Sequence, residues 1–534
     1  MIKNTMKPED FHLGVLAVMM TVALSACQQQ THHNASDDAE TNQINQTREL
    51  RALMQSDPHR PVYHFVAPEG RAYPFDPNGG VYWKCKYHLG FIYQNLERGS
   101  REHFWGHAVS TDLFHWTLYP DMLDVKEGDI EQGIFSGGAF LSKEGIPHII
   151  YHGQGSATNL VAYSTDEDLR VWKKFEGNPV LKTPEEDDPM HGKYVAWDPE
   201  GWYDEDTDYY YQISGGDVAG FFRSRDMLEW EYLGNLIDQE DRRRHDFEDL
   251  SCPDFFAMGD KHILLFISHN LGTQYYIGTF ENGRYHIETH GRMNWPGGTF
   301  FAPEELVDDR GRNMIWGWVL ERKPEHLADF GWSGIMSMPR VLSLSEADEM
   351  LIHPPEEVKA LRFGGVQEEN FTLPEHSEKE LSLQGKSMEI QVEFRGGGNS
   401  AYGVKVFCSP DGKEETVIQY DPLAKELVID FIKSSVHAPV LMRPNCMRDP
   451  ELPGFTENVT EQRAPFELRD GETLQLNIFI DRSIIEVFAN GRQCVTQVVY
   501  PELVESNRVK LFSGDEKVEV LAAEAWKMAE TNPF

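Results

Sequence analysis

Three short stretches of the sequence hold acidic side chains that could act as acids, bases or nucleophiles. Residues 75–80 read FDPNGG, residues 196–202 read AWDPEGW, and residues 245–255 read HDFEDLSCPDF with four acids. Taken locally, Asp-Pro-Asn-Gly is a turn sequence, and a run of charges is usually a solvated loop. Whether any of these carboxylates is catalytic therefore has to be judged from the secondary-structure elements that the surrounding sequence predicts.

Metal chemistry has little support in the sequence. The five cysteines after residue 27 are scattered and odd in number, which indicates neither a disulfide framework nor a zinc site. Histidines are numerous, but none lies in an HExxH-like or paired ligand spacing. We expect no cofactor and no catalytic metal. The histidines considered are His88, His103, His107, His115, His152 and His191.

Composition narrows the class of partner. A formal charge of -38 disfavours binding to nucleic acid, because a polyanion gains nothing by approaching this surface. The same charge disfavours phosphorylated or sulfated substrates, so a neutral substrate fits better. The content of 40% apolar and 12% aromatic residues is ample for folded cores, and 534 residues predict two domains.

The N-terminus resembles an export signal. Lys3 and Lys7 precede an apolar run that ends at Cys27, and Leu24-Ser25-Ala26-Cys27 looks like a bacterial lipobox. We predict a lipoprotein signal peptide at 1–27 and a flexible tether at 28–57. The chain would then be exported and held by a lipid on Cys27 to a bacterial membrane, the outer membrane facing the periplasm or the surface. The alternative is an ordinary signal peptide cut nearby.

The elements that must position the acids are predicted to be strands. Short apolar and aromatic runs broken by Gly, Asn, Asp and Pro fill residues 58–345. STDLFHW, STDEDLRVW and SRDMLEW recur there at blade-like spacing, which predicts a five-bladed β-propeller. We expect the closing tryptophans, Trp116, Trp172 and Trp230, to pack the blades. A linker at 346–375 and a β-sandwich at 376–534 complete an all-β fold.

Motif order adds a resemblance to a known family. FDPNGG is followed by YHLGFIYQ, FWGHAVSTDLFHW and FSGGA, and later by FFAPEEL, GWSGIMSMPR and DRSIIEVFANG. This series resembles glycoside hydrolase family 32, the β-fructosidases that include invertase, inulinase and levanase. The resemblance covers nearly all of residues 60–525. It implies a five-bladed propeller followed by a sandwich, and retaining hydrolysis with two carboxylates beside the scissile bond.

The resemblance also implies roles for individual residues. Asp76 matches the nucleophile, and Asp198 matches the aspartate that stabilises the transition state. Further family positions line the sugar pocket or bind substrate, and in this sequence they hold Asn78, Gln94, Trp105, Phe135 and Ser136. Glu486 in DRSIIEVFANG is expected to be structural or at an interface.

The sequence departs from the family at its acid/base motif. The family's Glu-Cys-Pro-Asp is here Ser251-Cys252-Pro253-Asp254, and the Arg of its Arg-Asp-Pro is Trp197. Glu248 is our first candidate for the general acid, ahead of Asp249 and Glu200, because a glutamate reaches further and has the higher unperturbed pKa.

Three functional hypotheses follow from this departure. The first is a β-fructofuranosidase, acting on sucrose, fructo-oligosaccharides or fructans, with a relocated general acid. The second is a catalytically inactive surface protein that binds sugars. The third is a hydrolase of another furanoside or an anhydro-sugar. We favour the enzyme, because a binding protein would not need both Asp76 and Asp198 directed at one carbon.

Overall fold

The computed structural model describes residues 41–67, 72–94, 102–237, 248–281, 283–396, 398–437 and 458–532. Cys27 and residues 245–247 lie outside these ranges. Residues 41–55 form a helix within the segment predicted to be a flexible tether. That helix belongs to a separate compact unit, and all strands belong to the unit His59–Pro533. None of the described helices has the length and apolar character that crossing a membrane requires.

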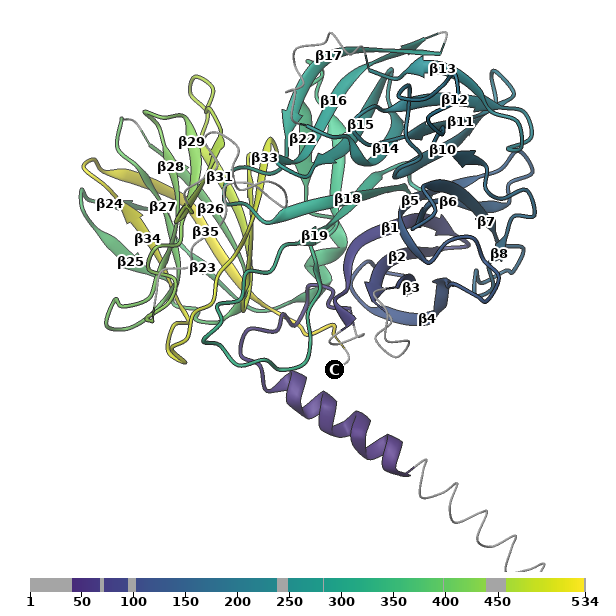
Figure 1. Cartoon of the computed structure of the whole chain (residues 1–534). Coiled ribbons are helices and arrows are strands. Elements are labelled where there is room, and N and C mark those ends of the chain that lie inside the picture. The colour runs from purple at the N-terminus through teal and green to yellow at the C-terminus, as the bar shows by residue number, and fades with distance from the viewer. Residues whose placement is uncertain are drawn as a thin grey trace, which may run out of the picture. The chain divides into compact units, whose positions relative to one another are not determined.

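The first part of this unit is a five-bladed propeller, as predicted (Figure 1). Each blade is an antiparallel sheet of four or five strands. The first blade contains β1 (Phe75–Trp83), β2 (Lys86–Gln94), β3 (His103–Ser110) and β4 (Trp116–Leu123). The second contains β5 (Gly133–Leu141), β6 (Pro147–Gln154), β7 (Thr158–Tyr163), β8 (Lys173–Lys174) and β9 (Leu181–Lys182).

The remaining blades follow in chain order. The third contains β10 (Pro199–Asp204), β11 (Tyr209–Ser214), β12 (Gly220–Ser224) and β13 (Glu231–Asn235). The fourth contains β14 (Ser251–Met258), β15 (Lys261–Ser268), β16 (Gly272–Glu281) and β17 (Arg284–Arg292). The fifth contains β18 (Phe300–Val307), β19 (Asn313–Val319), β20 (Ile335–Met336), β21 (Arg340–Leu344) and β22 (Met350–His353).

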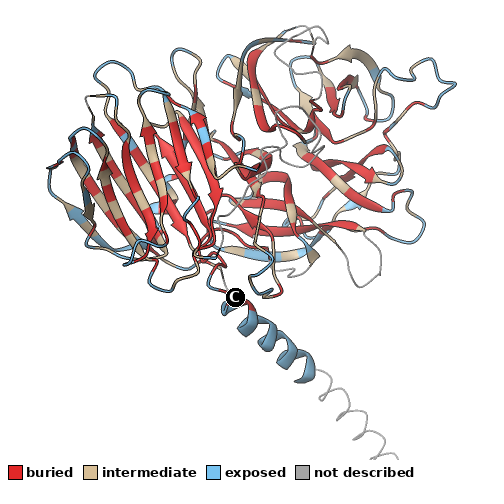
Figure 2. Cartoon of the chain, turned by 60° about the vertical axis from the view of Figure 1, so that its left-hand side comes forward, coloured by how far each residue is buried: buried red, intermediate tan, exposed pale blue. Residues whose placement is uncertain are grey.

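The innermost strand of each blade contacts its counterparts in the neighbouring blades. Strands β1, β5, β10, β14 and β18 touch in this order, and β18 touches β1, so the ring closes. Most of their residues are buried (Figure 2). Because both faces of these strands are covered, their sequences are mostly apolar and small residues and do not alternate between apolar and polar ones. Asp76 lies on β1, and Asp198 directly precedes β10.

Four of the five inner strands are irregular at one level of the ring. Pairing shifts register between Phe75 and Pro77 in β1, between Ile134 and Gly137 in β5, and likewise in β14 and β18. Non-glycine residues with positive φ lie in three of these irregularities: Asp76 at 26°, Cys252 at 45° and Ala302 at 42°. Such irregularities redirect side chains and are frequent beside active sites.

The repeated sequence motif is a turn between the outer strands of the blades. Leu113, Leu169 and Met227 occupy equivalent positions in it, with φ of 74°, 55° and 61°. The indole nitrogens of Trp172 and Trp230 donate to the carbonyls of Leu169 and Met227 at 2.9 and 3.1 Å. The repeat therefore specifies local structure, in agreement with the blade-packing role expected for its tryptophans.

The second part is a β-sandwich, which also confirms the prediction. One sheet contains β23 (Arg362–Glu368), β24 (Phe371–Leu373), β26 (Ser387–Arg395), β31 (Leu474–Asp481), β32 (Ile484–Ala489), β33 (Gln493–Val498) and β35 (Val518–Met528). The other contains β25 (Glu378–Glu380), β27 (Tyr402–Cys408), β28 (Thr416–Asp421), β29 (Glu426–Asp430), β30 (Glu461–Pro465) and β34 (Arg508–Ser513).

The sandwich starts earlier than the sequence indicated. Residues 346–375, expected to be a linker, contain β22, the 3-10 helix η3 (Glu356–Leu361), β23 and β24. Strand β23 pairs with β35 near the C-terminus. Composition concealed this, because the Pro, Glu and Gly of a short connection also occur in edge strands.

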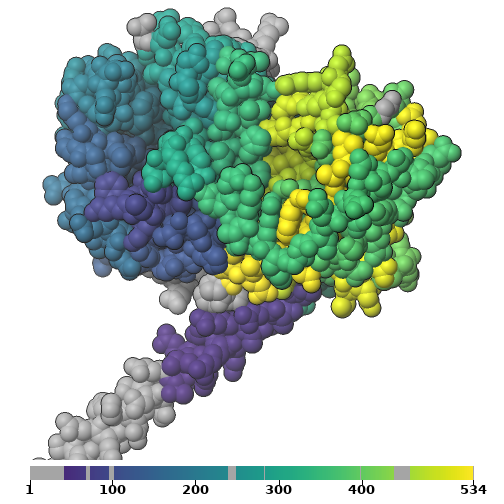
Figure 3. All heavy atoms as spheres, turned by 180° about the vertical axis from the view of Figure 1, so that it is seen from behind, coloured from purple at the N-terminus to yellow at the C-terminus, as the bar shows by residue number. Residues whose placement is uncertain are grey.

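A buried ionic network joins propeller and sandwich, whose atoms form one continuous surface in Figure 3. Glu486 of β32 is fully buried. It accepts hydrogen bonds from Arg340 Nη2 at 2.9 Å and from the Met338 backbone at 2.8 Å. Asp481 accepts from the backbone nitrogens of Tyr63 and His64 at 2.8 and 3.0 Å. Glu486 thus has the interface role that we expected.

Candidate active site

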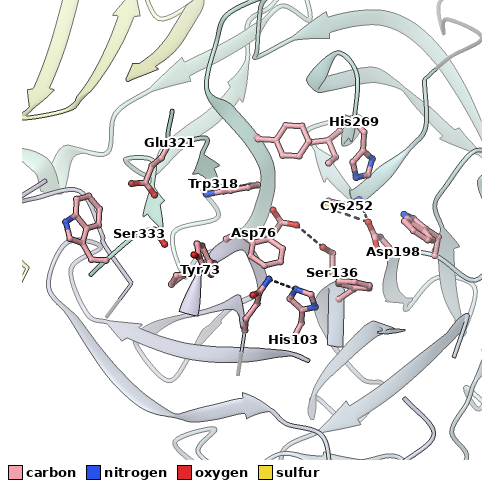
Figure 4. A pocket seen from close by; sticks show the side chains of 18 of the residues that line it. Tyr73, Asp76, His103, Ser136, Asp198, Cys252, His269, Trp318, Glu321 and Ser333 are labelled. Atoms are coloured by element: carbon pink, nitrogen blue, oxygen red, sulfur yellow. Dashed lines mark hydrogen bonds between the residues drawn. The ribbon is translucent and has the colours of Figure 1, made fainter. Parts of the chain in front are cut away.

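A cavity of about 690 Å³ opens at the level where the inner strands are irregular (Figure 4). Asp76 and Asp198 both lie in its wall, at the ends of strands from the first and third blades. The wall also includes aromatic rings and a few charged or polar groups. Its lining consists of Tyr73, Pro74, Phe75, Asp76, Gln94, His103, Phe135, Ser136, Trp197, Asp198, Cys252, Ile267, His269, Phe301, Trp318, Glu321, Lys323, Trp332 and Ser333.

Asp76 is held by its own motif. The Asn78 amide donates to the Asp76 carbonyl at 2.7 Å and accepts from the Gly137 backbone at 2.9 Å, which ties the turn to the second blade. Ser136 Oγ donates to Asp76 Oδ2 at 3.2 Å. The other carboxylate oxygen, Oδ1, is buried and has no hydrogen-bond partner among the described residues. One oxygen is thus positioned by Ser136, and no hydrogen bond from the described residues competes for the other.

The surroundings of Asp76 raise its pKa to about 7. Burial is the main cause, and the nearby negative charge of Asp198 adds to it. The hydrogen bond from Ser136 and the positive charge of His269 act in the opposite direction. A carboxyl group with this pKa is held at an energetic cost, which is typical of functional sites.

Asp198 directly precedes strand β10 and is only 6% exposed. Its Oδ2 accepts the backbone N–H of Cys252 at 3.2 Å, and His152 Nδ1 lies 3.3 Å from Oδ1. The Asp198 carbonyl also accepts the Gly215 backbone N–H at 2.9 Å. These contacts from the second, third and fourth blades fix the carboxylate opposite Asp76, where it can bind hydroxyl groups and stabilise positive charge.

Three of the five predicted substrate-binding residues line the cavity, namely Gln94, Phe135 and Ser136. The other two lie behind the wall. Asn78 is buried and supports the backbone around Asp76. Trp105 is fully buried, and its indole nitrogen donates to the Phe135 carbonyl at 3.0 Å. Both therefore hold residues that reach the cavity and are not placed to contact a substrate there.

The far side of the cavity was not anticipated from the sequence. Trp318 lies near the end of β19, and Glu321, Lys323 and Trp332 come from the segment that follows it. Glu321 Oε2 accepts the backbone N–H of Gly334 at 2.6 Å. The runs IWGWVL and GWSGIMSMPR contained a usable signal, because they hold Trp318 and Trp332, and an aromatic face can pack on a sugar ring.

None of the three candidate general acids lines the cavity. Glu248 is 3% exposed and accepts a hydrogen bond from Gln274 Nε2 at 2.5 Å. Glu200 is the second residue of β10 and lines a separate cavity of about 240 Å³, together with Asp254 and Glu304. Asp249 is buried and 3% exposed. The structure brings together Asp76 and Asp198, but it does not bring these acids to them.

The two departures from the expected motifs are in contact. The indole nitrogen of Trp197 donates to Ser251 Oγ at 3.0 Å, and Ser251 Oγ donates to Asp249 Oδ2 at 2.8 Å. Asp249 in turn holds His269 through the backbone nitrogen at 2.9 Å and through Nδ1 at 2.5 Å. A continuous hydrogen-bonded chain thus connects two cavity-lining side chains, Trp197 and His269.

Among the described residues, one group has ligand atoms close enough to hold a metal ion: His326, His437 and Glu502. His326 Nε2 lies 3.1 Å from Glu502 Oε1, and His437 Nδ1 lies 2.5 Å from Glu502 Oε2. None of the three lines the cavity.

Two family models match the chain, one over the propeller and one over the sandwich. The family model "Glycosyl hydrolases family 32 N-terminal domain" matches residues 64–355, and "Glycosyl hydrolases family 32 C terminal" matches residues 357–527. A levanase of Bacillus subtilis is 28% identical over 510 residues, which cover 86% of this chain and 69% of the levanase. A fructan 6-exohydrolase of Beta vulgaris is 26% identical over 541 residues, covering 89% and 88%.

Solved structures agree on the fold. The crystal structure of fructan 1-exohydrolase IIa from Cichorium intybus superposes with a TM-score of 0.75 at 23% identity, covering 89% of this chain and 98% of that one. The exo-inulinase from Aspergillus awamori superposes with a TM-score of 0.71 at 19% identity, covering 89% and 99%. Both likenesses extend over the propeller and the sandwich.

Proposed function

The chain belongs to glycoside hydrolase family 32, and from this we propose that it hydrolyses β-fructofuranosides by a retaining double displacement. Its substrates would be sucrose, fructo-oligosaccharides or fructans. The levanase and fructan exohydrolases among its relatives support this class of substrate. Asp76 is the nucleophile, and Asp198 stabilises the transition state.

One observation carries the proposal. Asp76 Oδ1 is buried and without a hydrogen-bond partner among the described residues, whereas Oδ2 is fixed by Ser136. The Asp198 carboxylate is close enough to raise the pKa of Asp76 by its charge. Two buried carboxylates held against their mutual repulsion are costly to a protein that only binds sugar, and they suit a reaction through a positively charged transition state.

The first chemical step follows from this geometry. Asp76 Oδ1 attacks the anomeric carbon of the fructosyl unit as the bond to the leaving oxygen breaks, which gives a covalent ester. Asp198 binds hydroxyl groups of the sugar and stabilises the oxocarbenium-like charge. In the second step, a water molecule attacks the anomeric carbon from the face opposite Asp76, the face that the leaving group vacated, and expels the Asp76 carboxylate. Two inversions leave the product with its original configuration.

The cavity suits a neutral sugar. Aromatic rings of Phe135, Trp197, Phe301, Trp318 and Trp332 form much of its lining, and aromatic faces pack well against the apolar faces of sugar rings. Among the described residues that line this cavity, Lys323 is the one Lys or Arg, whereas three are acidic: Asp76, Asp198 and Glu321. A phosphorylated substrate would meet net negative charge there.

The test is release of fructose from sucrose, inulin, levan and short fructans by the wild-type chain and by Asp76→Asn. We expect wild-type turnover on at least one of them and no measurable turnover by the variant. Asp254→Asn is the matched control, because it removes a buried propeller carboxyl that does not line the active-site cavity. It should remain active.

Three outcomes would contradict the proposal or part of it. Binding of fructosides without turnover, at high enzyme concentration, would indicate a sugar-binding protein. Turnover confined to unrelated furanosides or anhydro-sugars would change the substrate class. Retained turnover in Asp76→Asn would remove this residue from the mechanism.

We also propose that the chain is exported and lipid-anchored to a bacterial membrane through Cys27. The support is the sequence Leu24-Ser25-Ala26-Cys27 after an apolar run. Radiolabelled palmitate should be incorporated by the wild type and not by Cys27→Ser, and the variant should leave the membrane fraction. Membrane retention of an unlabelled Cys27→Ser protein would contradict the anchor.

A further inference from the structure

The general acid is the missing part of this active site. At the position of the family glutamate, Ser251 is fully buried and engaged with Trp197 and Asp249. A serine hydroxyl is far too weak an acid to protonate a leaving oxygen. The proton donor must therefore be another group that reaches the cavity.

His269 lies at the end of the neighbouring strand. It directly follows β15, whose Ile267 pairs with Ser251 of β14. Asp249 fixes both its backbone, at 2.9 Å, and its ring Nδ1, at 2.5 Å. With Nδ1 committed to Asp249, Nε2 is the ring nitrogen that can exchange a proton with a substrate.

His269 also faces the catalytic carboxylates. It lines the cavity beside Cys252 and Asp198, as Figure 4 shows. Its positive charge lowers the pKa of Asp76, which places the imidazole within electrostatic range of the nucleophile. A group that acts on the leaving oxygen must occupy this kind of position, close to the attacked carbon but on a different strand from the nucleophile.

The other donors in the wall fit less well. Burial holds the pKa of the Cys252 thiol well above its usual value, so it releases a proton reluctantly. Burial lowers the pKa of His103, whose Nδ1 lies 2.9 Å from Gln154 Oε1, so this ring is neutral. Tyr73 is 60% exposed, and Glu321 accepts a backbone hydrogen bond from Gly334.

We propose that His269, oriented by Asp249, is the general acid and base of this enzyme in place of the family glutamate. The proposal rests on the hydrolase function given above. Asp249 is the positioning residue. Although burial opposes it, the contacts with His269 hold the pKa of Asp249 well below its usual range, so it stays anionic and stabilises the imidazolium.

The step balances without a further reactant. The imidazolium gives its Nε2 proton to the glycosidic oxygen, which leaves with the electron pair of the broken C–O bond, while Asp76 forms the ester. The neutral imidazole then takes a proton from water, whose oxygen attacks the anomeric carbon and releases the Asp76 carboxylate. His269 is thereby protonated again for the next cycle.

The decisive variant is His269→Gln, measured on sucrose or a fructan and on p-nitrophenyl β-fructofuranoside. The nitrophenolate needs little protonation to leave. We expect a loss of about 100-fold or more on the natural substrate, and a burst of nitrophenolate near one per active site on the activated one. Steady turnover should then be slow, because deglycosylation lacks its base, and azide should restore it by forming a fructosyl azide.

His115→Gln is the matched control. Like His269, His115 has its Nδ1 paired with an aspartate, Asp112 Oδ2, at 2.7 Å. Unlike His269, it is exposed and does not line the cavity. It should behave as wild type on both substrates. Asp249→Asn provides a second measurement: the alkaline limb of the kcat/KM profile should move down by about one pH unit, because an anionic partner raises the pKa of an imidazole.

The outcomes separate this inference from the proposed function. Wild-type behaviour of His269→Gln on sucrose overturns the inference, as do equal losses on both substrates without azide rescue. If Asp76→Asn is inactive at the same time, the hydrolase function stands and only the assignment of His269 falls. If the wild type releases no fructose from any fructoside, the proposed function itself fails.

Discussion

Asp76 combines an unusual backbone conformation with an unfavourable electrostatic environment. Its φ of 26° lies in a region that non-glycine residues rarely adopt, and its pKa is raised to about 7 by burial and by Asp198. Both features cost stability at a residue that lines the cavity. Similar costs are often found at catalytic residues, where the surrounding fold compensates for them.

Asp76→Asn should therefore stabilise the fold while it abolishes turnover. Because the folded-state pKa of about 7 exceeds the usual 3.8, this carboxyl destabilises the protein increasingly as pH rises from about 4 to about 7. The variant should gain on the order of 4 kcal/mol at pH 7.5 and almost nothing at pH 4. Urea denaturation at the two pH values measures this, and an equal effect at both would contradict it.

Asp198→Asn should change the pH profile of the reaction. The nucleophile must be ionised, so kcat/KM should rise with pH up to about 7, the pKa of Asp76. Removing the Asp198 charge should move this acidic limb to lower pH, because one cause of the raised pKa is gone. The variant should also lose at least about 100-fold in kcat. A loss confined to KM would mean that Asp198 only binds substrate.

At the scale of elements, the inner strands position two layers of groups. Residues at the irregular level face the active-site cavity. Two residues further along their strands, Glu200, Asp254 and Glu304 line a second, smaller cavity. Burial raises the pKa of each well above its usual value, and repulsion from neighbouring carboxyls, with Glu305 acting on all three, adds to it. These carboxyls therefore reduce the stability of the propeller as rising pH favours their ionised forms.

Glu200→Gln should raise stability at alkaline pH. A carboxyl whose folded pKa is raised costs stability as pH rises above its unfolded pKa, and an amide removes that cost. One pKa unit corresponds to about 1.4 kcal/mol, so we expect a gain of at least this order at pH 8 and none at pH 4. Differential scanning calorimetry across this range measures the effect. A loss of stability at pH 8 would show that the carboxylate makes a favourable contact.

The strands were predictable from the sequence, but the irregularities within them were not. Short aromatic runs separated by turn residues identified the blades, and FDPNGG identified the position of Asp76. Alternation in a regular strand, however, says nothing about a shift of register between Ser251 and Asp254. Glu248 was chosen for its reach and pKa, whereas the decisive factor is that His269, at the end of another strand, reaches the cavity through a non-local pairing.

At the scale of the whole molecule, the buried ionic network is the main polar connection described between propeller and sandwich. Although burial opposes both shifts, His64 is raised to a pKa of about 9 by Asp481 and Glu486, and Glu486 is lowered to about 2 by His64 and Arg340. The contribution of Glu486 is complete above pH 4.5 and is lost as pH falls through about 2. That of His64 is complete below pH 6.5 and is lost as pH rises through about 9.

Glu486→Gln should destabilise the whole unit by about 3–5 kcal/mol, because it leaves the fully buried Arg340 without a charge partner. Glu519→Gln is the control: its pair with Arg395 is exposed, and its loss should cost about 0–1 kcal/mol. Chemical denaturation at pH 6 measures both. Equal, small effects would show that the interface depends on apolar packing alone.

The series of hydrogen bonds from Trp197 through Ser251 and Asp249 to His269 has a consequence for engineering this site. Installing the family glutamate by Ser251→Glu would place a larger, charged group where the Trp197 indole donates its hydrogen bond. Replacing Trp197 with Arg alone would leave an unpaired cation beside a serine. Each exchange is therefore harmful by itself, and only the combined exchange can be neutral.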